Sequence, residues 1–285
     1  EILCPKEDYP NFLDKYIELP LLQRLSGIGL LCGSDWTSLF NNRFYYSRLD
    51  HSIGVALIVW HFTHNKTQTI AGLLHDISTT VFSHVSDFRN GDALTQTSTE
   101  EPTKRIIKSD KKLLDLLNKD NICVDDVIDY HKYPIADNEI PQLSADRLEY
   151  MFPSGMALEG SWELSDVKRI YNNITIYKNE ENIDELGFKN LSIAEEYCRR
   201  FCITGHILQM NEDKITLHLL SQIMNKAVRL NVLQEEDFMC LSEKPLLEKL
   251  ELGLIQKKDS KNSDLKYEKK LNELSPLNKT FKNMT

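Results

Sequence analysis

The chain has 285 residues, of which 41% are hydrophobic and 27% are charged, and its formal net charge is −9 at pH 7. This length and hydrophobic content suffice for one large core or two smaller ones, and the acidic balance disfavours non-specific binding of nucleic acid by the whole surface. The six cysteines have no disulfide-framework or CxxC spacing, no apolar run is long enough to span a membrane, and no secretory signal begins the chain; we therefore expect a cytoplasmic protein with reduced thiols and no membrane association.

Apolar residues recur at helical spacing along most of the chain and predict an all-α fold. The expected helices are Leu21–Leu31, Ser52–Phe62, Thr67–Ile77, Lys104–Leu117, Val124–His131, a helix from Pro141 to Tyr150 that Pro153 and Gly155 close, Leu164–Asn172, and Ile193–Leu233 with an interruption near Asn211. The helices at 52–62 and 67–77 are apolar on almost every side, as buried helices would be. The only β-structure that we expect is a small hairpin near 173–178, where three β-branched residues follow one another in Asn-Ile-Thr-Ile-Tyr.

The domain organisation follows from where composition changes. We expect a single helical body over residues 1–256, with a motif core at 20–152 and a helical extension at 153–256. A polar loop at 88–103 follows the motif residues and is expected to act as a lid or specificity element. Residues 257–285 hold eight lysines and four acidic residues, which predicts a basic tail: a solvated, weakly ordered segment, or an arm that contacts a neighbouring subunit or a polyphosphate.

Two adjacent polar residues, His75 and Asp76, interrupt an apolar run, where unpaired polar groups would cost about 1–3 kcal/mol each. A second imidazole, His51, begins another apolar helix, and Asp146 lies in a third. Imidazole and carboxylate ligands from three buried helices suit a divalent transition metal with open positions for water and substrate. The pattern therefore predicts a metal site and a metallohydrolase, whereas each histidine taken singly is better explained as a hydrogen-bonded core residue.

Five segments carry a resemblance to a known superfamily: Gln23-Arg-Leu25, Arg48-Leu-Asp-His51-Ser-Ile-Gly-Val55, Leu74-His75-Asp76-Ile77, Phe82-Ser83-His84 and Ala145-Asp146-Arg147-Leu-Glu-Tyr150. They resemble the HD-domain metal-dependent phosphohydrolases, and most of all the deoxynucleoside triphosphate triphosphohydrolase branch. The resemblance implies an HD-domain helical bundle, a homo-oligomer, and one divalent ion (Mn²⁺, Fe²⁺, Ni²⁺, Mg²⁺ or Zn²⁺) on His51, His75, Asp76 and Asp146. It also implies that metal-activated water attacks a nucleotide or another phosphate ester.

The same resemblance implies substrate contacts. Arg48 would meet a phosphate, with Arg147 as a further cation, while Gln23 would approach the sugar or base and Tyr150 would pack on the sugar. The guanidinium fork of Arg48 suits phosphate oxygens, although a surface salt bridge with Asp50 is an alternative. For Gln23 and Tyr150 the alternative is a place in helix packing.

The chain also departs from the triphosphohydrolase pattern. Thr79 stands where that branch has a catalytic histidine, Thr99-Glu100 stands where a His-Glu pair is expected, and Ser154 replaces an aspartate that would read the sugar. His84 and Glu100 are the remaining candidates for the proton donor to the leaving oxygen.

Three functions are compatible with these residues. The first is a single-metal phosphohydrolase of the triphosphohydrolase type. The second is an HD-type phosphodiesterase or two-metal oxygenase, for which only His84 and His131 could supply the extra imidazoles. The third is a catalytically silent domain that binds a nucleotide or a partner and keeps its metal for stability. Metal stoichiometry separates the first two, and turnover separates both from the third.

Overall fold

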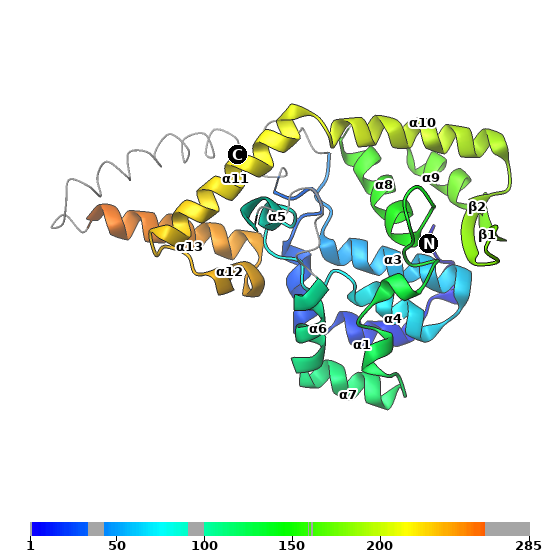
Figure 1. The fold of residues 1–285 in the computed structure, drawn as a ribbon, viewed down its shortest axis with the longest axis horizontal. Coiled ribbons are helices and arrows are strands. Elements are labelled where there is room, and N and C mark those ends of the chain that lie inside the picture. The colour runs from blue at the N-terminus through cyan, green and yellow to red at the C-terminus, as the bar shows by residue number, and fades with distance from the viewer. Residues whose placement is uncertain (1, 34–42, 91–99, 159, 161, 260–285) are drawn as a thin grey trace.

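A computed structural model of the protein describes residues 2–33, 43–90, 100–158, 160 and 162–259 (Figure 1). In these residues the fold is almost entirely helical, with one two-stranded antiparallel hairpin, which confirms the all-α prediction. The hairpin pairs β1 (Ile174–Lys178) with β2 (Asp184–Phe188), and β1 lies at the predicted position. No helix in the described part of the chain is long and apolar enough to cross a membrane.

The α-helices are α1 (Asp14–Ile17), α2 (Pro20–Gln23), α3 (Arg48–Thr63), α4 (Lys66–Leu74), α5 (Val85–Asn90), α6 (Glu100–Ser109), α7 (Lys111–Lys119), α8 (Ala145–Leu158), α9 (Leu164–Tyr171), α10 (Leu191–Ile207), α11 (Asn211–Arg229), α12 (Glu235–Cys240) and α13 (Glu243–Asp259). Short 3₁₀ turns cover Lys6–Asp8, Asn11–Leu13, Arg24–Gly27, Val124–Asp126 and Tyr130–Lys132.

Helices α3 and α4 form an antiparallel pair at the centre of the molecule, joined by His64 and Asn65. His64 ends α3 with a left-handed backbone (φ 47°), and the Asn65 side chain caps α4 by accepting a hydrogen bond from the backbone N–H of Gln68 at 3.1 Å. A tight turn therefore separates two buried helices, and it holds their apolar faces together.

Four predicted helices in the N-terminal half are wrong in their extent. The predicted helix at 67–77 ends at Leu74, and His75 is its C-cap. The predicted helix at 21–31 ends at Gly27, because residues 28–30 extend alongside residues 46–48, with Leu30 N–H donating to the Tyr46 carbonyl at 2.9 Å. The predicted helix at 104–117 is two helices, since Asp110 caps α7 by accepting from the Leu113 N–H at 2.8 Å. The predicted helix at 124–131 is a pair of 3₁₀ turns, where the Asp129 side chain accepts from the His131 N–H and competes with helical bonding.

The helix that carries Asp146 also differs from its prediction at both ends. It begins at Ala145 rather than at Pro141, because Ser144 caps it by accepting from the Arg147 N–H at 3.2 Å. It continues through Pro153 to Leu158, and Pro153 is buried in the folded chain. Burial of apolar surface there offsets the backbone hydrogen bond that the proline removes.

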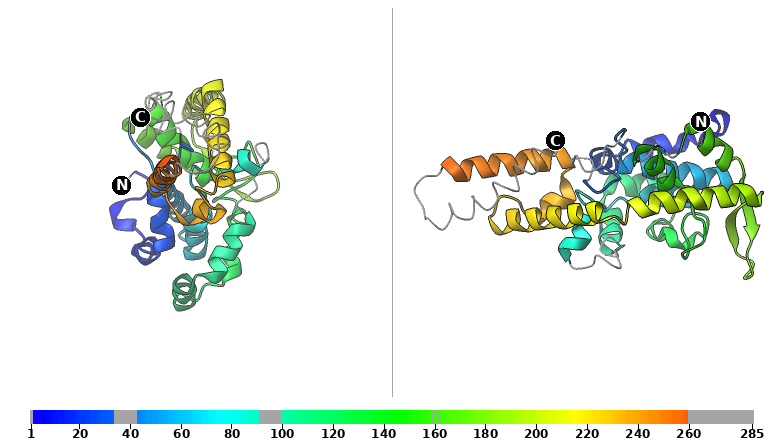
Figure 2. Two further views of the ribbon diagram at one scale, coloured as in Figure 1. Left: turned by 90° about the vertical axis from the view of Figure 1, so that its left-hand side faces the viewer. Right: turned by 90° about the horizontal axis from the view of Figure 1, so that it is seen from above.

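Three hydrophobic clusters organise the interior. One joins the N-terminal turns, α3, α4 and α7, and a second joins α3, α8, α9, α10 and the hairpin. A third cluster lies apart, where α5 packs with α11, α12 and α13, and we call these four helices the C-terminal lobe. Figures 1 and 2 show α11 and α13 side by side, extending away from the central α3–α4 pair. The α13 helix runs on to Asp259, and the remainder of the predicted basic tail lies outside the described residues.

Candidate metal centre

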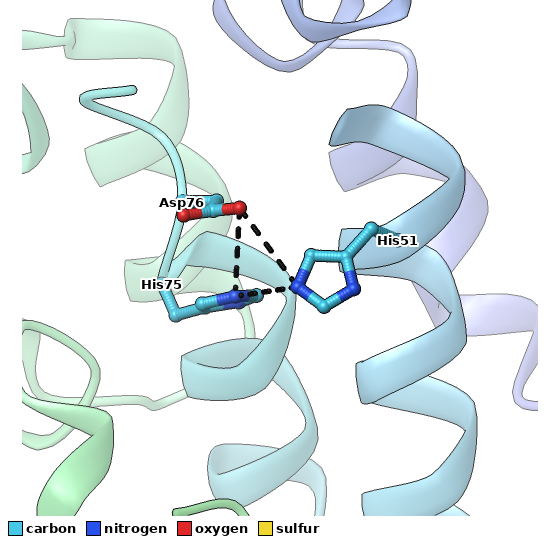
Figure 3. A group of neighbouring side chains, drawn as sticks. All are labelled: His51, His75 and Asp76. Atoms are coloured by element: carbon cyan, nitrogen blue, oxygen red, sulfur yellow. Dashed lines mark hydrogen bonds and ion pairs between the residues drawn. The ribbon is translucent and has the colours of Figure 1, made fainter. Parts of the chain in front are cut away.

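His51 lies in the first turn of α3, and local capping fixes its place. Ser47 and Asp50 form a reciprocal cap, in which each side chain accepts a hydrogen bond from the other residue's backbone N–H at 3.1 Å. The His51 side chain is 2% exposed and points from α3 toward the end of α4 (Figure 3). The capping sequence thus sets the helix start that presents this imidazole to its neighbours.

His75 and Asp76 stand where α4 ends, so the two adjacent side chains turn toward the same point although a continuous helix would separate them by about 100°. Asp146 reaches the same point from the first turn of α8. The backbone N–H groups of Ala145 and Asp146 donate to the carbonyls of Ile135 and Ala136 at 2.8 and 3.2 Å, which fixes the beginning of α8.

The four predicted ligands gather in one place. His51 Nε2 lies 3.2 Å from His75 Nε2, and Asp76 Oδ2 lies 3.9 and 3.7 Å from these two nitrogens (Figure 3). Asp146 Oδ1 is 3.1 Å from His51 Nε2 and 4.0 Å from His75 Nε2. Among the described residues, His51, His75 and Asp76 are the one group whose ligand atoms could together hold a metal ion, and Asp146 flanks that group.

Hydrogen bonds at the outer nitrogens show that these residues fit an ion. His75 Nδ1 lies 2.7 Å from the Gly72 carbonyl oxygen, which can only accept, so Nδ1 carries a proton. His51 Nδ1 lies 2.5 Å from the Glu149 carboxylate and is protonated for the same reason. In the neutral imidazoles both Nε2 lone pairs then face each other, an arrangement that a bound cation satisfies.

Mutual attraction between these charges shifts their pKa values strongly. Burial lowers the pKa of His51, but the carboxylates of Glu149 and Asp146 outweigh burial and raise it to about 10. Burial raises the pKa of Asp146, but the hydrogen bond from His51 and the two imidazoles lower it to about 2. Protons and a metal ion therefore compete for the same lone pairs, as expected where ligands must be deprotonated.

Asp76 receives two further hydrogen bonds. Arg48 Nη1 donates to Oδ2 at 2.8 Å, and the Thr79 hydroxyl donates to Oδ1 at 3.0 Å. Burial raises the pKa of Asp76, but the Arg48 guanidinium and the two imidazoles outweigh it and hold the pKa far below the ordinary range. Thr79 thus has an orienting contact with a candidate ligand.

Arg48 is 8% exposed and does not form the surface salt bridge with Asp50 that the sequence left open. Besides Asp76, it contacts Ser83 Oγ through Nε at 3.0 Å and Cys32 Sγ through Nη2 at 4.0 Å. Asp50 instead caps α3. The guanidinium therefore contacts the candidate ligand Asp76, and its Nη2 atom has only the long contact with the Cys32 sulfur.

Three residues near the centre have no assignment from the sequence. Glu149 contacts His51, Tyr130 donates from its hydroxyl to Asp146 Oδ2 at 3.2 Å while its ring lies 4.9 Å from the His75 ring, and Arg24 donates to the carbonyl of Thr79 at 2.7 Å. The only available signal was Glu149 itself, a carboxylate three residues after Asp146 and on the same helix face.

The predicted substrate-binding residues differ from one another in their exposure and in their hydrogen-bond partners. Tyr150 is half-buried, and burial together with the Asp146 carboxylate raises its pKa to about 12. Arg147 bonds to Asn138 and the Gln142 carbonyl and lies 3.2 Å from Asp137. Gln23 is exposed and donates to the Ile17 carbonyl at 2.8 Å.

The two candidate proton donors lie outside the ligand group. His84 is 41% exposed at its side chain, and its Nδ1 lies 2.9 Å from the buried Asp87 carboxylate. It follows Ser83, the hydroxyl partner of Arg48. Glu100 begins α6, but its side chain lies outside the part of the chain that the structure describes.

Known proteins share parts of this sequence and its fold. The chain is 27% identical over 194 residues to the uncharacterized protein YdhJ of Bacillus subtilis, a match that covers 67% of this chain and 53% of YdhJ. It is 28% identical over 156 residues to the metal-dependent phosphohydrolase cns2 of Cordyceps militaris, covering 55% of this chain and 44% of cns2. The chain thus spans about half the length of these relatives. No family profile matches it.

Two solved structures have a similar fold. A hypothetical protein from Aquifex aeolicus superposes with a TM-score of 0.57 at 18% identity, covering 85% of this chain and 68% of that protein. A phosphohydrolase from Bacteroides thetaiotaomicron superposes with a TM-score of 0.57 at 16% identity, covering 96% of this chain and 74% of that protein. The chain shares their fold. At these identities the likeness concerns the fold alone.

Proposed function

We propose that this chain is a metal-dependent phosphohydrolase of the HD type, acting on a nucleotide or a related phosphate ester. One observation carries the proposal: two imidazole Nε2 atoms lie 3.2 Å apart, beside the Asp76 and Asp146 carboxylates, and each Nδ1 is hydrogen-bonded away from the centre. The sequence match to cns2, which is named a metal-dependent phosphohydrolase, supports the same activity. The fold, which a bacterial phosphohydrolase shares, is compatible with it.

The ligands would be His51, His75, Asp76 and Asp146. A divalent ion bound by them would lower the pKa of a bound water and polarise a phosphoryl oxygen. Thr79 and Arg48 orient the two oxygens of Asp76, and Tyr130 holds the outer oxygen of Asp146. Each carboxylate is therefore fixed before a substrate arrives, as catalysis by preorganised groups requires.

Arg48 is the residue that we expect to meet the phosphate. Its Nη1 and Nε are engaged by Asp76 and Ser83, but the contact of Nη2 with Cys32 Sγ at 4.0 Å is weak. Nη2 can exchange this sulfur for a phosphoryl oxygen without releasing Asp76. The guanidinium would then neutralise charge that builds on the phosphate during water attack.

His84 and Glu100 remain the proposed donors of a proton to the leaving oxygen. Asp87 engages Nδ1 of His84, which orients the ring and leaves Nε2 as the atom able to hand over a proton. His84 follows Ser83, whose hydroxyl accepts a hydrogen bond from Arg48.

Three further residues are the proposed contacts of the leaving group and of additional phosphates: Gln23, Arg147 and Tyr150. Tyr150 and Gln23 are retained as sugar or base contacts. Arg147 is engaged by Asp137, Asn138 and Gln142, so it would have to exchange these partners to neutralise a polyphosphate. That arrangement favours a substrate with fewer phosphates over a triphosphate.

The two-metal alternative has less support. His131, one of its two possible extra imidazoles, is 54% exposed and pairs with Asp129 and Asp137. His84 pairs with Asp87. Within the described part of the chain, neither belongs to the group that could hold an ion.

A chromatographic product screen tests the proposed function. The protein with Mn²⁺ is incubated with nucleoside mono-, di- and triphosphates of both sugars, beside Asp76→Ala. We expect product from the wild type and none from Asp76→Ala, which removes one ligand and the partner of Arg48. Nucleoside with intact triphosphate would establish the triphosphohydrolase reaction, and inorganic phosphate from a monophosphate would establish a nucleotidase.

Asp237→Ala is a matched control, because the Asp237 side chain is 14% exposed and the Asp76 side chain is 17% exposed, and both accept hydrogen bonds from a cation. Asp237 lies in the C-terminal lobe, so its removal should leave turnover per folded molecule unchanged. Full activity of Asp76→Ala would contradict the metal mechanism. Mn²⁺ binding by the wild type without product from any nucleotide would favour a catalytically silent domain.

A further inference from the structure

Glu149 is a carboxylate buried to the same degree as the apolar core, with 2% of its surface exposed. It lies on α8, one helical turn after Asp146, and it has no part in the phosphate contacts proposed above. An isolated ionised carboxylate in such a place is strongly unfavourable unless partners compensate for the lost water. Its partners therefore indicate what the residue does.

Both oxygens of Glu149 are engaged, each by a different element. Oε2 accepts from His51 Nδ1 at 2.5 Å, and Oε1 accepts from the Tyr46 hydroxyl at 2.6 Å. Tyr46 lies immediately before the cap of α3, and His51 lies in its first turn. The carboxylate thus joins α8 to the start of α3, and its shortest contact is with a candidate ligand.

The α3 helix leaves a space for this contact. Gly54 follows His51 by three residues and faces α8, and a Cβ built on Gly54 would lie 2.4 Å from Glu149 Oε1. No side chain larger than hydrogen fits there unless the carboxylate moves. A glycine in a helix interior costs stability relative to alanine, so its presence beside Glu149 indicates that the close approach is a built feature.

We infer that Glu149 is a positioning residue for the metal centre. It holds the proton on Nδ1 of His51 and fixes the ring, so that the Nε2 lone pair faces His75 Nε2 and the two aspartates. Tyr46 in turn holds Glu149, and Gly54 gives it room. This inference rests on the proposed function, because the lone pair matters only if an ion binds there.

Mn²⁺ affinity tests the inference independently of turnover. Free Mn²⁺ is followed by electron paramagnetic resonance during titration of the wild type and of Glu149→Gln, which keeps the size of the side chain and removes its charge. We expect Glu149→Gln to bind Mn²⁺ about 10–100-fold more weakly, the range found when the carboxylate partner of a ligating histidine is lost. Tyr46→Phe leaves the His51 contact in place and should weaken binding by a smaller factor.

A spectroscopic signature separates positioning from general stability. In Zn²⁺-loaded wild type, the Nδ1 proton of His51 should give a strongly downfield ¹H signal because its hydrogen bond to a charged acceptor is short. This signal should move upfield in Glu149→Gln. It should not move in Glu243→Gln, a control that alters a glutamate 1% exposed in the C-terminal lobe, whose carboxylate accepts from the Gly29 N–H at 2.9 Å.

The outcomes distinguish this inference from the proposed function. Equal Mn²⁺ affinity and an unmoved His51 signal in folded Glu149→Gln would overturn the positioning role and leave the phosphohydrolase proposal intact. If Glu149→Gln does not fold, unchanged Mn²⁺ affinity and an unmoved signal in Tyr46→Phe overturn the role instead. Wild-type protein that binds no Mn²⁺ would overturn the proposed metal mechanism itself. Weakened binding in Glu149→Gln, with no hydrolysis by the wild type, would support the role and contradict the activity.

Discussion

The motif helices α3, α4 and α8 and the helices of the C-terminal lobe both bury an arginine, and they engage it differently. Arg48 donates to Asp76, whose carboxylate also faces two imidazole nitrogens. Arg89, in α5, donates to Asn225 and Glu235, and its guanidinium lies 4.0 Å from the centre of the Phe238 ring. The hydrogen bonds of Arg89 end at the half-buried Asn225 and the exposed Glu235. Arg48 instead bonds to Asp76, which lies beside imidazole nitrogens whose lone pairs converge on one point. Buried charge alone therefore does not indicate chemistry, but convergent ligand atoms do.

The largest expected effect comes from removing each arginine in turn. Arg48→Ala should retain Mn²⁺ binding, because all four ligands remain, and should lower kcat about 100-fold or more through lost stabilisation of phosphate charge. Arg89→Ala should cost about 1–3 kcal/mol of unfolding free energy and leave kcat per folded molecule unchanged. Mn²⁺ titration, urea unfolding and steady-state kinetics on both variants make the comparison. A similar loss of kcat in both would contradict the division between the two regions.

Gly54 in α3 and Gly253 in the C-terminal lobe allow the same substitution, glycine to alanine, to be made in both regions. An added Cβ at Gly54 meets the Glu149 carboxylate at 2.4 Å, and one at Gly253, in α13, meets the Val232 side chain at 2.6 Å. Each alanine variant should lose about 1–3 kcal/mol from overpacking. Only Gly54→Ala should also weaken Mn²⁺ binding, because it displaces Glu149. Thermal unfolding and metal titration of the pair test this; unaltered Mn²⁺ affinity in a destabilised Gly54→Ala would argue against a link between the space at Gly54 and the metal centre.

The smallest expected effect concerns acid sensitivity outside the centre. Burial raises the pKa of Asp120, but hydrogen bonds from Lys15, Lys66 and Tyr16 outweigh it and lower the pKa from its ordinary value of 3.8 to about 2. A carboxylate with a lowered pKa contributes stability that is present above pH 3.8 and is lost as the pH falls toward 2. Because both lysines are more than a third exposed, solvent screening limits the contribution to about 1 kcal/mol.

Asp237 offers the comparison in the C-terminal lobe. Burial raises its pKa, and the Gln234 N–H and Lys249 lower it below the ordinary range with fewer partners than Asp120 has. In urea unfolding, Asp120→Asn should therefore lose more stability at pH 7 than Asp237→Asn, and the difference between Asp120→Asn and the wild type should shrink as the pH falls to 2. A difference that persists at pH 2 would show that the Asp120 carboxylate is not the source.

Some of the fold was accessible from the residues alone. The apolar run at 52–62 is long enough for hydrophobic periodicity to dominate, and α3 covers it completely. The helix breaks at Asp110 and Asp129 were missed because a side-chain cap competes with the helix only in the folded backbone. The continuation of α8 through Pro153 was missed because burial in the folded chain offsets the local penalty of a proline inside a helix.

The sequence by itself determined the chemical types at the centre: two imidazoles and two carboxylates, set in apolar surroundings that require them to be paired. Only the tertiary structure decided which groups meet. Arg48 pairs with Asp76 rather than the nearby Asp50, and Glu149 reaches His51 across 98 positions of the chain. Residue type and local spacing fix the ends of a helix, whereas contacts between helices depend on packing angles and on free space such as that at Gly54, which no local pattern encodes.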